Sequence, residues 1–252
     1  MAAQKTAPTK PTTRSGGASK APKRTTPTRT APTQASSRSA ATATTPVVSG
    51  RSESRRVTSD RQASFTVPSL EMGEGAAVAT LLQDRLVALA DLGATLKHIH
   101  WNVVGPHFVS IHQMLDPQYA GVQRMTDDFA ERIATLGGVP RALPGAIVAQ
   151  RSWDDYELGR ADAIAHLGAL DLVYSGVISD HRAAIQAISD VDPISEDVLI
   201  ESTRELEKYQ WFVRSHLEDW AGGMSTAGAV TEMAAARAVL DKRPPAGGRR
   251  TS

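Results

Sequence analysis

Residues 109–136 read VSIHQMLDPQYAGVQRMTDDFAERIATL, and this stretch decides the fold of the chain. Its apolar residues recur at the three-to-four-residue spacing of an amphipathic helix. Gly105-Pro106 precedes the run and Gly137-Gly138 follows it, so turn signals bound a single long helix. The apolar face comprises Ile111, Leu115, Val122, Met125, Phe129, Ile133 and Leu136.

The same spacing predicts three further long helices. One begins near residue 76, a second covers about 161–188, and a third runs from about 195 to 220 with Ser195 as a plausible N-cap. A short helix near Trp153 and another over 230–240 are compatible with the pattern. No alternation typical of strands competes with these helices.

Four helices of about 25 residues with short links predict an all-α protein built as a four-helix bundle. The connection of about 20 residues between the second and third helices is longer than a hairpin needs, which favours a ferritin-like crossover along the bundle. We therefore divide the chain into a basic tail over 1–62, a bundle over 63–222, and a basic tail with a possible short helix over 223–252.

Charge is distributed unevenly along the chain. Residues 1–62 hold 12 basic and 2 acidic side chains, and residues 241–252 hold 4 and 1. The remaining body carries 24 acidic and 12 basic residues. An acidic body with two basic ends is typical of a protein that meets a polyanion. The absence of Cys excludes disulfides and thiolate metal sites, and no apolar run is long enough for a membrane span.

The amino-terminal segment is predicted to be disordered. Of its first 50 residues, 37 are Ala, Thr, Pro, Ser or Gly, and the first Leu is Leu70. A solvated solubility tail and a mitochondrial transit peptide are alternatives, although frequent Pro disfavours the second. We favour an arm whose Lys and Arg neutralise the phosphates of a polyanion without reading sequence, and the lack of Cys fits a reducing cytoplasm.

Potential metal ligands share one stripe of the central helix. His112, Asp116, Asp127 and Glu131 lie within about 100° of helix surface, and His100 lies near the end of the preceding helix. Imidazole and carboxylate without thiolate suit Fe or Zn, and the oxygen-rich part also suits Mn. A row of acids on a helix is more often a solvated face, so both interpretations remain open at this point.

Helix geometry limits how such a site could close. Asp116 and Asp127 are 11 residues apart, which is about 16 Å along a helix, so one copy cannot bring them to one ion. Two copies packed antiparallel about a two-fold axis could. The intrachain di-iron site of helical bundles needs Glu-x-x-His, and no His here has Glu three residues before it.

Several motifs together resemble the Dps mini-ferritins, particularly the actinobacterial members. They are Lys97-His98-Ile99-His100-Trp101-Asn102-Val103, Gly105-Pro106-His107-Phe108, His112-Gln113-Met114-Leu115-Asp116, Asp127-Asp128-Phe129-Ala130-Glu131-Arg132-Ile133 and Glu205-Leu206-Glu207-Lys208-Tyr209-Gln210-Trp211-Phe212. The resemblance covers about residues 65–220, and its His-x11-His-x3-Asp-x10-Asp-x3-Glu spacing is highly specific.

The resemblance implies a ferroxidase centre shared between subunits. His100, His112 and Asp116 would come from one subunit, Asp127 and Glu131 from its two-fold mate, and Trp101 would lie beside them. The family forms hollow homo-oligomeric dodecamers that oxidise Fe(II), preferably with hydrogen peroxide, and store Fe(III) mineral, and some members bind DNA through basic tails. The alternative for this chain is a nucleoid-compacting protein whose metal site is minor or idle.

The remaining polar residues carry simpler expectations. His98 is expected at an interface or in solvent, His107 in solvent, and the Trp residues other than Trp101 in the core or an interface. Arg132 is expected to form a salt bridge, and Pro117 could kink its helix by removing a backbone donor. No carboxylate at helix spacing is predicted to act as a ligand together with His166, His181 or His216. Asp190, Asp192 and Asp197 flank a helix break and are expected to be solvated turn acids or, as the resemblance implies, to line an acidic three-fold pore.

Overall fold

The computed structural model describes residues 63–242, and the expectations for 1–62 and 243–252 lie outside this range. The described part holds six helices and two short strands. In chain order they are α1 (Met72–Asn102), β1 (Val103–Val104), α2 (Phe108–Thr135), α3 (Pro144–Gln150), β2 (Ala161–Asp162), α4 (Ala163–Ile188), α5 (Pro193–Arg214) and α6 (Glu232–Asp241).

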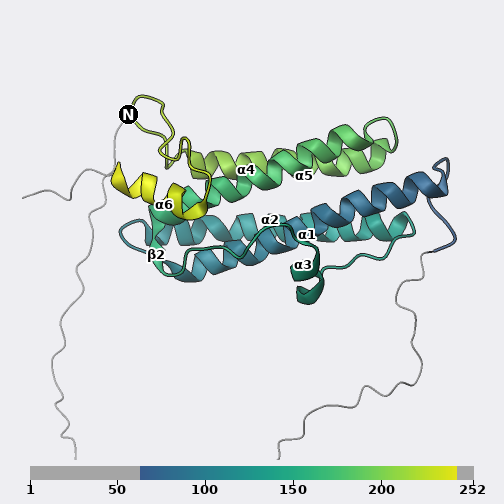
Figure 1. The fold of residues 1–252 in the computed structure, drawn as a ribbon, viewed down its shortest axis with the longest axis horizontal. Helices are drawn as coiled ribbons and strands as arrows, with labels where there is room; N and C mark the ends of the chain where they lie inside the picture. The colour runs from purple at the N-terminus through teal and green to yellow at the C-terminus, as the bar shows by residue number, and fades with distance from the viewer. Residues whose placement is uncertain (1–62, 243–252) are drawn as a thin grey trace, which may run out of the picture. The chain divides into compact units, whose positions relative to one another are not determined.

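The four long helices form two helical hairpins. α1 packs against α2, and α4 packs against α5, and the two hairpins stack as layers of one bundle (Figure 1). The predicted all-α, ferritin-like four-helix bundle is therefore confirmed. The predicted short helix near the carboxyl end is present as α6, which packs on α4. None of the helices in 63–242 is long and apolar enough to cross a membrane.

The crossover connection runs along the bundle from one end to the other. β1, directly after α1, pairs in parallel with β2, directly before α4, with Val103 opposite Ala161. α4 therefore begins at the end where α1 finishes. α2 finishes at the opposite end, where the carbonyl of Gly137 accepts a hydrogen bond from the backbone N–H of Ala63. The connection contains α3, and Trp153 follows that helix.

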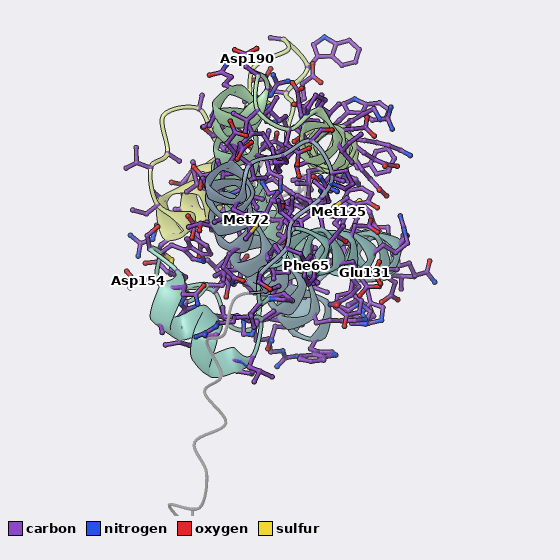
Figure 2. All side chains as sticks on the ribbon, turned by 90° about the vertical axis from the view of Figure 1, so that its right-hand side faces the viewer. Phe65, Met72, Met125, Glu131, Asp154 and Asp190 are labelled. Atoms are coloured by element: carbon purple, nitrogen blue, oxygen red, sulfur yellow. The ribbon has the colours of Figure 1, made fainter. Side chains whose placement is uncertain are left out.

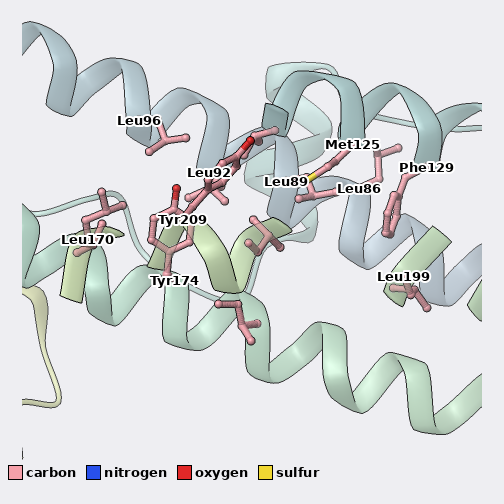
Figure 3. Packing of buried hydrophobic residues seen from close by; sticks show 14 of the residues in the cluster. Leu86, Leu89, Leu92, Leu96, Met125, Phe129, Leu170, Tyr174, Leu199 and Tyr209 are labelled. Atoms are coloured by element: carbon pink, nitrogen blue, oxygen red, sulfur yellow. The ribbon is translucent and has the colours of Figure 1, made fainter. Parts of the chain in front are cut away.

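The core is built from the apolar stripes of all four long helices. Figure 3 shows leucines of α1, Leu86 and Leu89 among them, facing Phe129 of α2 and Tyr174 of α4. Each fully buried side chain of this size contributes about 1.5–3 kcal/mol, which holds the two hairpins together. The Tyr174 hydroxyl donates to Oε1 of buried Gln118 at 2.8 Å, a polar contact between the hairpins.

Glycines end the segments where the sequence predicts breaks. Gly105 before α2 has φ +100°, and Gly137 after α2 has φ +84°. Residues with a side chain rarely adopt such positive φ values. A Cβ on Gly137 would also lie 2.2 Å from the carbonyl oxygen of Phe65. Both predicted helix boundaries are confirmed.

The predicted limits of the last long helix are wrong at both ends. α5 begins at Pro193 with Asp192 at the N-cap position, so Ser195 lies inside the first turn. The helix ends at Arg214, before residue 220. Beyond it, Asp219 Oδ1 accepts from the N–H groups of Ala221 and Gly223, and this local turn replaces further helix.

Candidate metal centre

Two imidazoles meet where α1 ends and α2 begins. His100 lies in the last turn of α1, and His112 lies near the start of α2. Their rings stack with centroids 3.6 Å apart and planes inclined by 24°. Twelve residues separate them in sequence, and the tight turn at Gly105 brings them together.

A reciprocal pair of hydrogen bonds fixes both rings. His100 Nδ1 lies 3.0 Å from the carbonyl oxygen of His112, and His112 Nδ1 lies 2.9 Å from the carbonyl oxygen of His100. A carbonyl can only accept, so each Nδ1 carries a proton, and in the neutral form of the ring each Nε2 keeps a lone pair. Neither Nε2 has a hydrogen-bond partner in the described part of the chain. Imidazoles that bind metals are oriented in this manner, with the second nitrogen donating to a carbonyl or carboxylate.

Asp116 lies beside the two imidazoles and is paired with Lys97. Its Oδ1 is 2.7 Å from Lys97 Nζ and 3.5 Å from His100 Nδ1, and the side chain is half exposed. The hydrogen bond from Lys97 lowers the pKa of Asp116, partial desolvation opposes this, and the charge of His100 adds to the lowering. The carboxylate therefore stays ionised and available as an oxygen ligand.

Lys97 is the neighbour that sequence reasoning missed. Its ammonium also lies 4.9 Å from the centroid of the Tyr119 ring, so it is held from two sides. The sequence spacing could have indicated this contact, because Lys97 precedes His100 by three residues and therefore lies on the same face of α1.

Asp127 and Glu131 lie far along α2 from the histidines. Both are exposed, and neither carboxylate makes a hydrogen bond or ion pair with the described residues. Figure 2 shows Glu131 at the edge of the helical body. The structure thus brings His100, His112 and Asp116 together and leaves Asp127 and Glu131 apart. In one copy of residues 63–242, no three His, Asp or Glu side chains are placed to hold an ion together.

Trp101 and Pro117 flank this region. Trp101 follows His100 at the end of α1 and is 74% exposed, so its indole faces away from the core of its own chain. Pro117 lies inside α2, and the helix continues through it to Thr135. The missing backbone donor does not interrupt the element that carries Asp116.

A groove beside Glu131 contains more carboxylates than the sequence pattern suggests. It encloses about 360 Å³ between α2 and α5, and Asp128, Glu201 and Glu205 share it with Glu131. Arg124 pairs with Glu205 at 3.1 Å. Because α5 contributes half of these acids, periodicity along α2 could not reveal them.

The other histidines have structural surroundings. His98 was expected at an interface or in solvent, but it is half-buried and its Nε2 donates to the carbonyl of Leu158 at 2.8 Å, tying the crossover to α1. His166 and His181 are fully buried, whereas His107 and His216 are exposed. The expectation for His107 is confirmed.

The acids at the α4–α5 turn do not share one environment. Asp192 is 5% exposed and pairs with Arg132 at 2.7 Å, so the expected salt bridge of Arg132 is confirmed. The interpretation of Asp192 as a solvated or pore-lining acid is wrong, because its carboxylate is occupied by this ion pair and by the Ser195 hydroxyl. Asp190 and Asp197 are exposed, and their role stays a prediction.

The tryptophans are not core residues of the single chain, so of the two expected placements the core is wrong and an interface stays a prediction. Trp211 is 63% exposed and Trp220 is fully exposed, while Trp153 is half-buried. Trp211 projects from α5, and Trp220 lies in the turn after it, where the predicted helix is absent. Leu217, in the same turn, supplies the buried contact instead.

Comparison with known proteins places this fold in a class. The ferritin-like domain model matches residues 79–222. The DNA protection during starvation protein of Mycolicibacterium smegmatis is 52% identical over 173 residues, covering 69% of this chain and 94% of that protein. The chain belongs to the Dps family of mini-ferritins.

Two further proteins are similar to this chain over most of their own length. The structure of DpsA14 from Streptomyces coelicolor has a TM-score of 0.64 and 55% identity, covering 66% of this chain and 98% of that one. The fine tangled pili major subunit of Haemophilus ducreyi is 45% identical over 185 residues, covering 73% of this chain and 98% of that protein.

Proposed function

We propose that this protein oxidises Fe(II) at centres shared between subunits, preferably with hydrogen peroxide, and stores the ferric product inside a hollow dodecamer. Its basic tails bind DNA non-specifically, so the protein protects DNA in the bacterial cytoplasm and is associated with the nucleoid. Several of its relatives are named DNA protection during starvation proteins, which supports the proposed role in protecting DNA.

The stacked pair of His100 and His112 is the observation that carries the iron chemistry. Their Nδ1 atoms are committed to carbonyls and their Nε2 atoms are open, while Asp116 adds an oxygen ligand nearby. Imidazole together with carboxylate binds Fe(II) and leaves positions for an oxidant. These side chains orient the substrate ion, and the electron transfer is chemistry of the iron and the peroxide.

A second copy supplies the missing half of the proposed centre. Asp127 and Glu131 lie about 16–22 Å along α2 from the Asp116 position, too far to reach the same ion. An antiparallel two-fold contact between two α2 helices would set the exposed carboxylates of one chain opposite the imidazoles of the other. The excess of acid in residues 63–240 would draw cations toward the assembly.

The alternative is a DNA-compacting protein with an idle metal site, and the ion pair between Lys97 and Asp116 is the observation in its favour. The ammonium occupies a ligand oxygen at 2.7 Å. Anaerobic addition of Fe(II) followed by peroxide separates the two functions. We expect rapid ferric absorbance from an assembly whose native mass matches twelve chains. DNA binding without accelerated oxidation would favour the alternative.

Deleting residues 1–62 tests the role of the amino-terminal tail. The deletion removes a net charge of +10 per chain, so retardation of DNA in gels should fall sharply while iron oxidation stays unchanged. Binding by the intact protein should weaken steeply as salt rises, because phosphate contacts release counterions. Residues 241–252 are a second contributor, and unchanged retardation after removal of both tails would contradict the DNA role.

A further inference from the structure

A second concave site lies away from the candidate metal centre. It encloses about 470 Å³ between α1, α4, the segment after α3 and the beginning of α6. Asp154, on its rim, and Glu131, of the candidate centre, lie on opposite sides of the helical body in Figure 2. Nothing in the proposed iron chemistry uses this pocket.

The floor of the pocket is apolar and open. Val173 and Val177 of α4 line it, with Gly176 between them. A Cβ built on Gly176 would meet no atom within 4 Å, so a glycine at this helix position leaves space for a guest. Mid-helix glycine is unfavourable relative to Ala by about 1 kcal/mol, and packing among residues 63–242 does not require it here.

One wall is an aromatic ring held in place. Trp153 Nε1 donates to Asp91 Oδ2 at 2.6 Å, and Arg151 pairs with the other oxygen of Asp91 at 3.3 Å. A fixed indole offers its face to aliphatic groups and to cations, for which it is the preferred aromatic partner.

The charged residues at the rim of the pocket are all acidic. Five carboxylates line it and no basic residue does: Asp154, Asp155, Glu157, Asp180 and Glu232. Asp155 and Asp180 already pair with arginines outside the pocket. Asp154 has no ionic partner in the described part of the chain, so the rim retains negative charge.

Glu157 and Glu232 approach each other with only backbone donors between them. Glu232 Oε2 accepts from the N–H of Glu157 at 2.7 Å, and Glu157 Oε2 accepts from the N–H of Met233 at 3.0 Å. Burial raises the pKa of Glu232, the hydrogen bond from the backbone of Glu157 opposes this, and the charges of Glu157 and Asp91 add to the rise. A cation beside this pair would relieve their repulsion.

We propose that this pocket binds arginine side chains of the chain's own carboxyl-terminal segment, residues 243–252. That segment reads RPPAGGRRTS and contains three arginines and no acid. An arginine side chain matches the site, since its stem can lie on the apolar floor and its guanidinium can reach Trp153 and the acidic rim.

The chain can reach the pocket from where it leaves the described region. Thr231 and Glu232 line the pocket, and α6 then carries the chain about 15 Å away to Asp241. The seven residues that follow Lys242, ending at Arg249, span up to about 24 Å when extended. Arg249 and Arg250 can therefore return along α6 to the pocket of the same subunit.

Docking would make the pocket a competitor of DNA for the same arginines. The carboxyl-terminal segment would be held on the protein surface when no polyanion is near, and released when phosphates outcompete the carboxylates. The binding step itself does not depend on iron oxidation or on DNA binding, so its test stands apart from the proposed function.

The experiment uses a chain ending at Lys242 and a fluorescent peptide of residues 243–252. We expect saturable binding by fluorescence anisotropy, weaker at higher salt. Replacing Arg249 and Arg250 by Ser in the peptide should weaken binding by about tenfold or more, equal to 1.4 kcal/mol or more. The protein variant Gly176→Arg should do the same, because it fills the floor with a competing cation.

Gly145→Arg is the matched control. Gly145 lies in α3, also has open space around it, and does not line the pocket. It adds the same charge and should leave peptide binding unchanged. Glu157→Gln with Asp154→Asn weakens the rim without adding bulk, which keeps the test valid if Gly176→Arg perturbs folding.

Three results would overturn the proposal. The first is that the peptide does not bind, and the second is that it binds both pocket variants with the parental affinity. The third is that a peptide of the same length and charge from residues 1–62 binds with equal affinity and its binding is also weakened by Gly176→Arg. The last would show a basic-peptide site without preference for the carboxyl-terminal segment.

Discussion

The two halves of the candidate iron centre differ in how far one chain organises them. At the junction of α1 and α2, His100 and His112 are stacked, hydrogen-bonded through Nδ1 and half-buried. Further along α2, Asp127 and Glu131 are exposed and make no side-chain hydrogen bond within residues 63–242. The imidazole half is preorganised, whereas the carboxylate half is not.

This difference follows from what each ligand type requires. An imidazole must present one particular nitrogen, so a second hydrogen bond has to fix its ring and tautomer. A carboxylate presents two equivalent oxygens and can adjust to an arriving ion by rotating. The local structure of one chain therefore orients the two histidines, and we expect the carboxylates to become ordered against a second copy.

The largest effect should come from destroying the preorganised half. His112→Ala combined with Asp116→Ala removes a ring and an oxygen ligand, so rapid peroxide-driven oxidation of Fe(II) should be lost. Ferric absorbance after mixing measures it, and circular dichroism should still report a folded helical protein. His107→Ala is the matched control, because His107 is an exposed histidine in the adjoining turn. Parental rates in the double variant would place the oxidation elsewhere.

A mixing experiment tests whether the two halves come from different chains. His112→Ala and Glu131→Ala should each be inactive alone. In a two-fold interface formed by one chain of each kind, one site receives both lesions and the other receives none. Under random mixing, half the interfaces are mixed and half of their sites are whole, so about a quarter of parental activity should return.

An intrachain centre predicts no recovery, because every chain carries one lesion. The two variants are co-expressed or co-refolded, native mass confirms that they share assemblies, and oxidation is then measured. Activity no higher than that of the separate variants, in assemblies shown to be mixed, would reject the intersubunit arrangement.

The smallest effect concerns the ion pair inside the preorganised half. Lys97→Met removes the ammonium from Asp116, so an arriving Fe(II) no longer displaces it. Exposed ion pairs contribute little, so anaerobic titration should show Fe(II) bound only about twofold more tightly. Weaker binding would instead mean that Lys97 positions the carboxylate for the metal.

The same variant should shift the pH dependence of binding. The hydrogen bond from Lys97 lowers the pKa of Asp116, so the parental carboxylate stays charged to lower pH than an ordinary aspartate. Without Lys97 that pKa should rise toward its usual value, and Fe(II) binding should begin to fail at a higher pH as the solution is acidified. Identical pH profiles would show that the ion pair does not control this carboxylate.

Much of the architecture could be read from local sequence. The helical spacing of Leu115, Phe129 and Ile133 and the glycines at 105 and 137 located α2 to within a residue or two. The end of α5 could not be read in this way. The apolar run continues to Trp220, but the helix ends at Arg214, and further along the Asp219 side chain accepts from the backbone N–H groups of Ala221 and Gly223, contacts that periodicity does not reveal.

The sequence by itself determined the bundle, its crossover and the ligand spacing on α2, because these depend on periodicity and helix rise along one chain. Only the tertiary structure decided which groups face each other across elements. It committed both Nδ1 atoms to opposing carbonyls, paired Lys97 with Asp116, buried Asp192 against Arg132, and closed an acidic pocket around Trp153. Such contacts join residues that are distant along the chain, so their partners are fixed by how the helices pack and not by any local pattern.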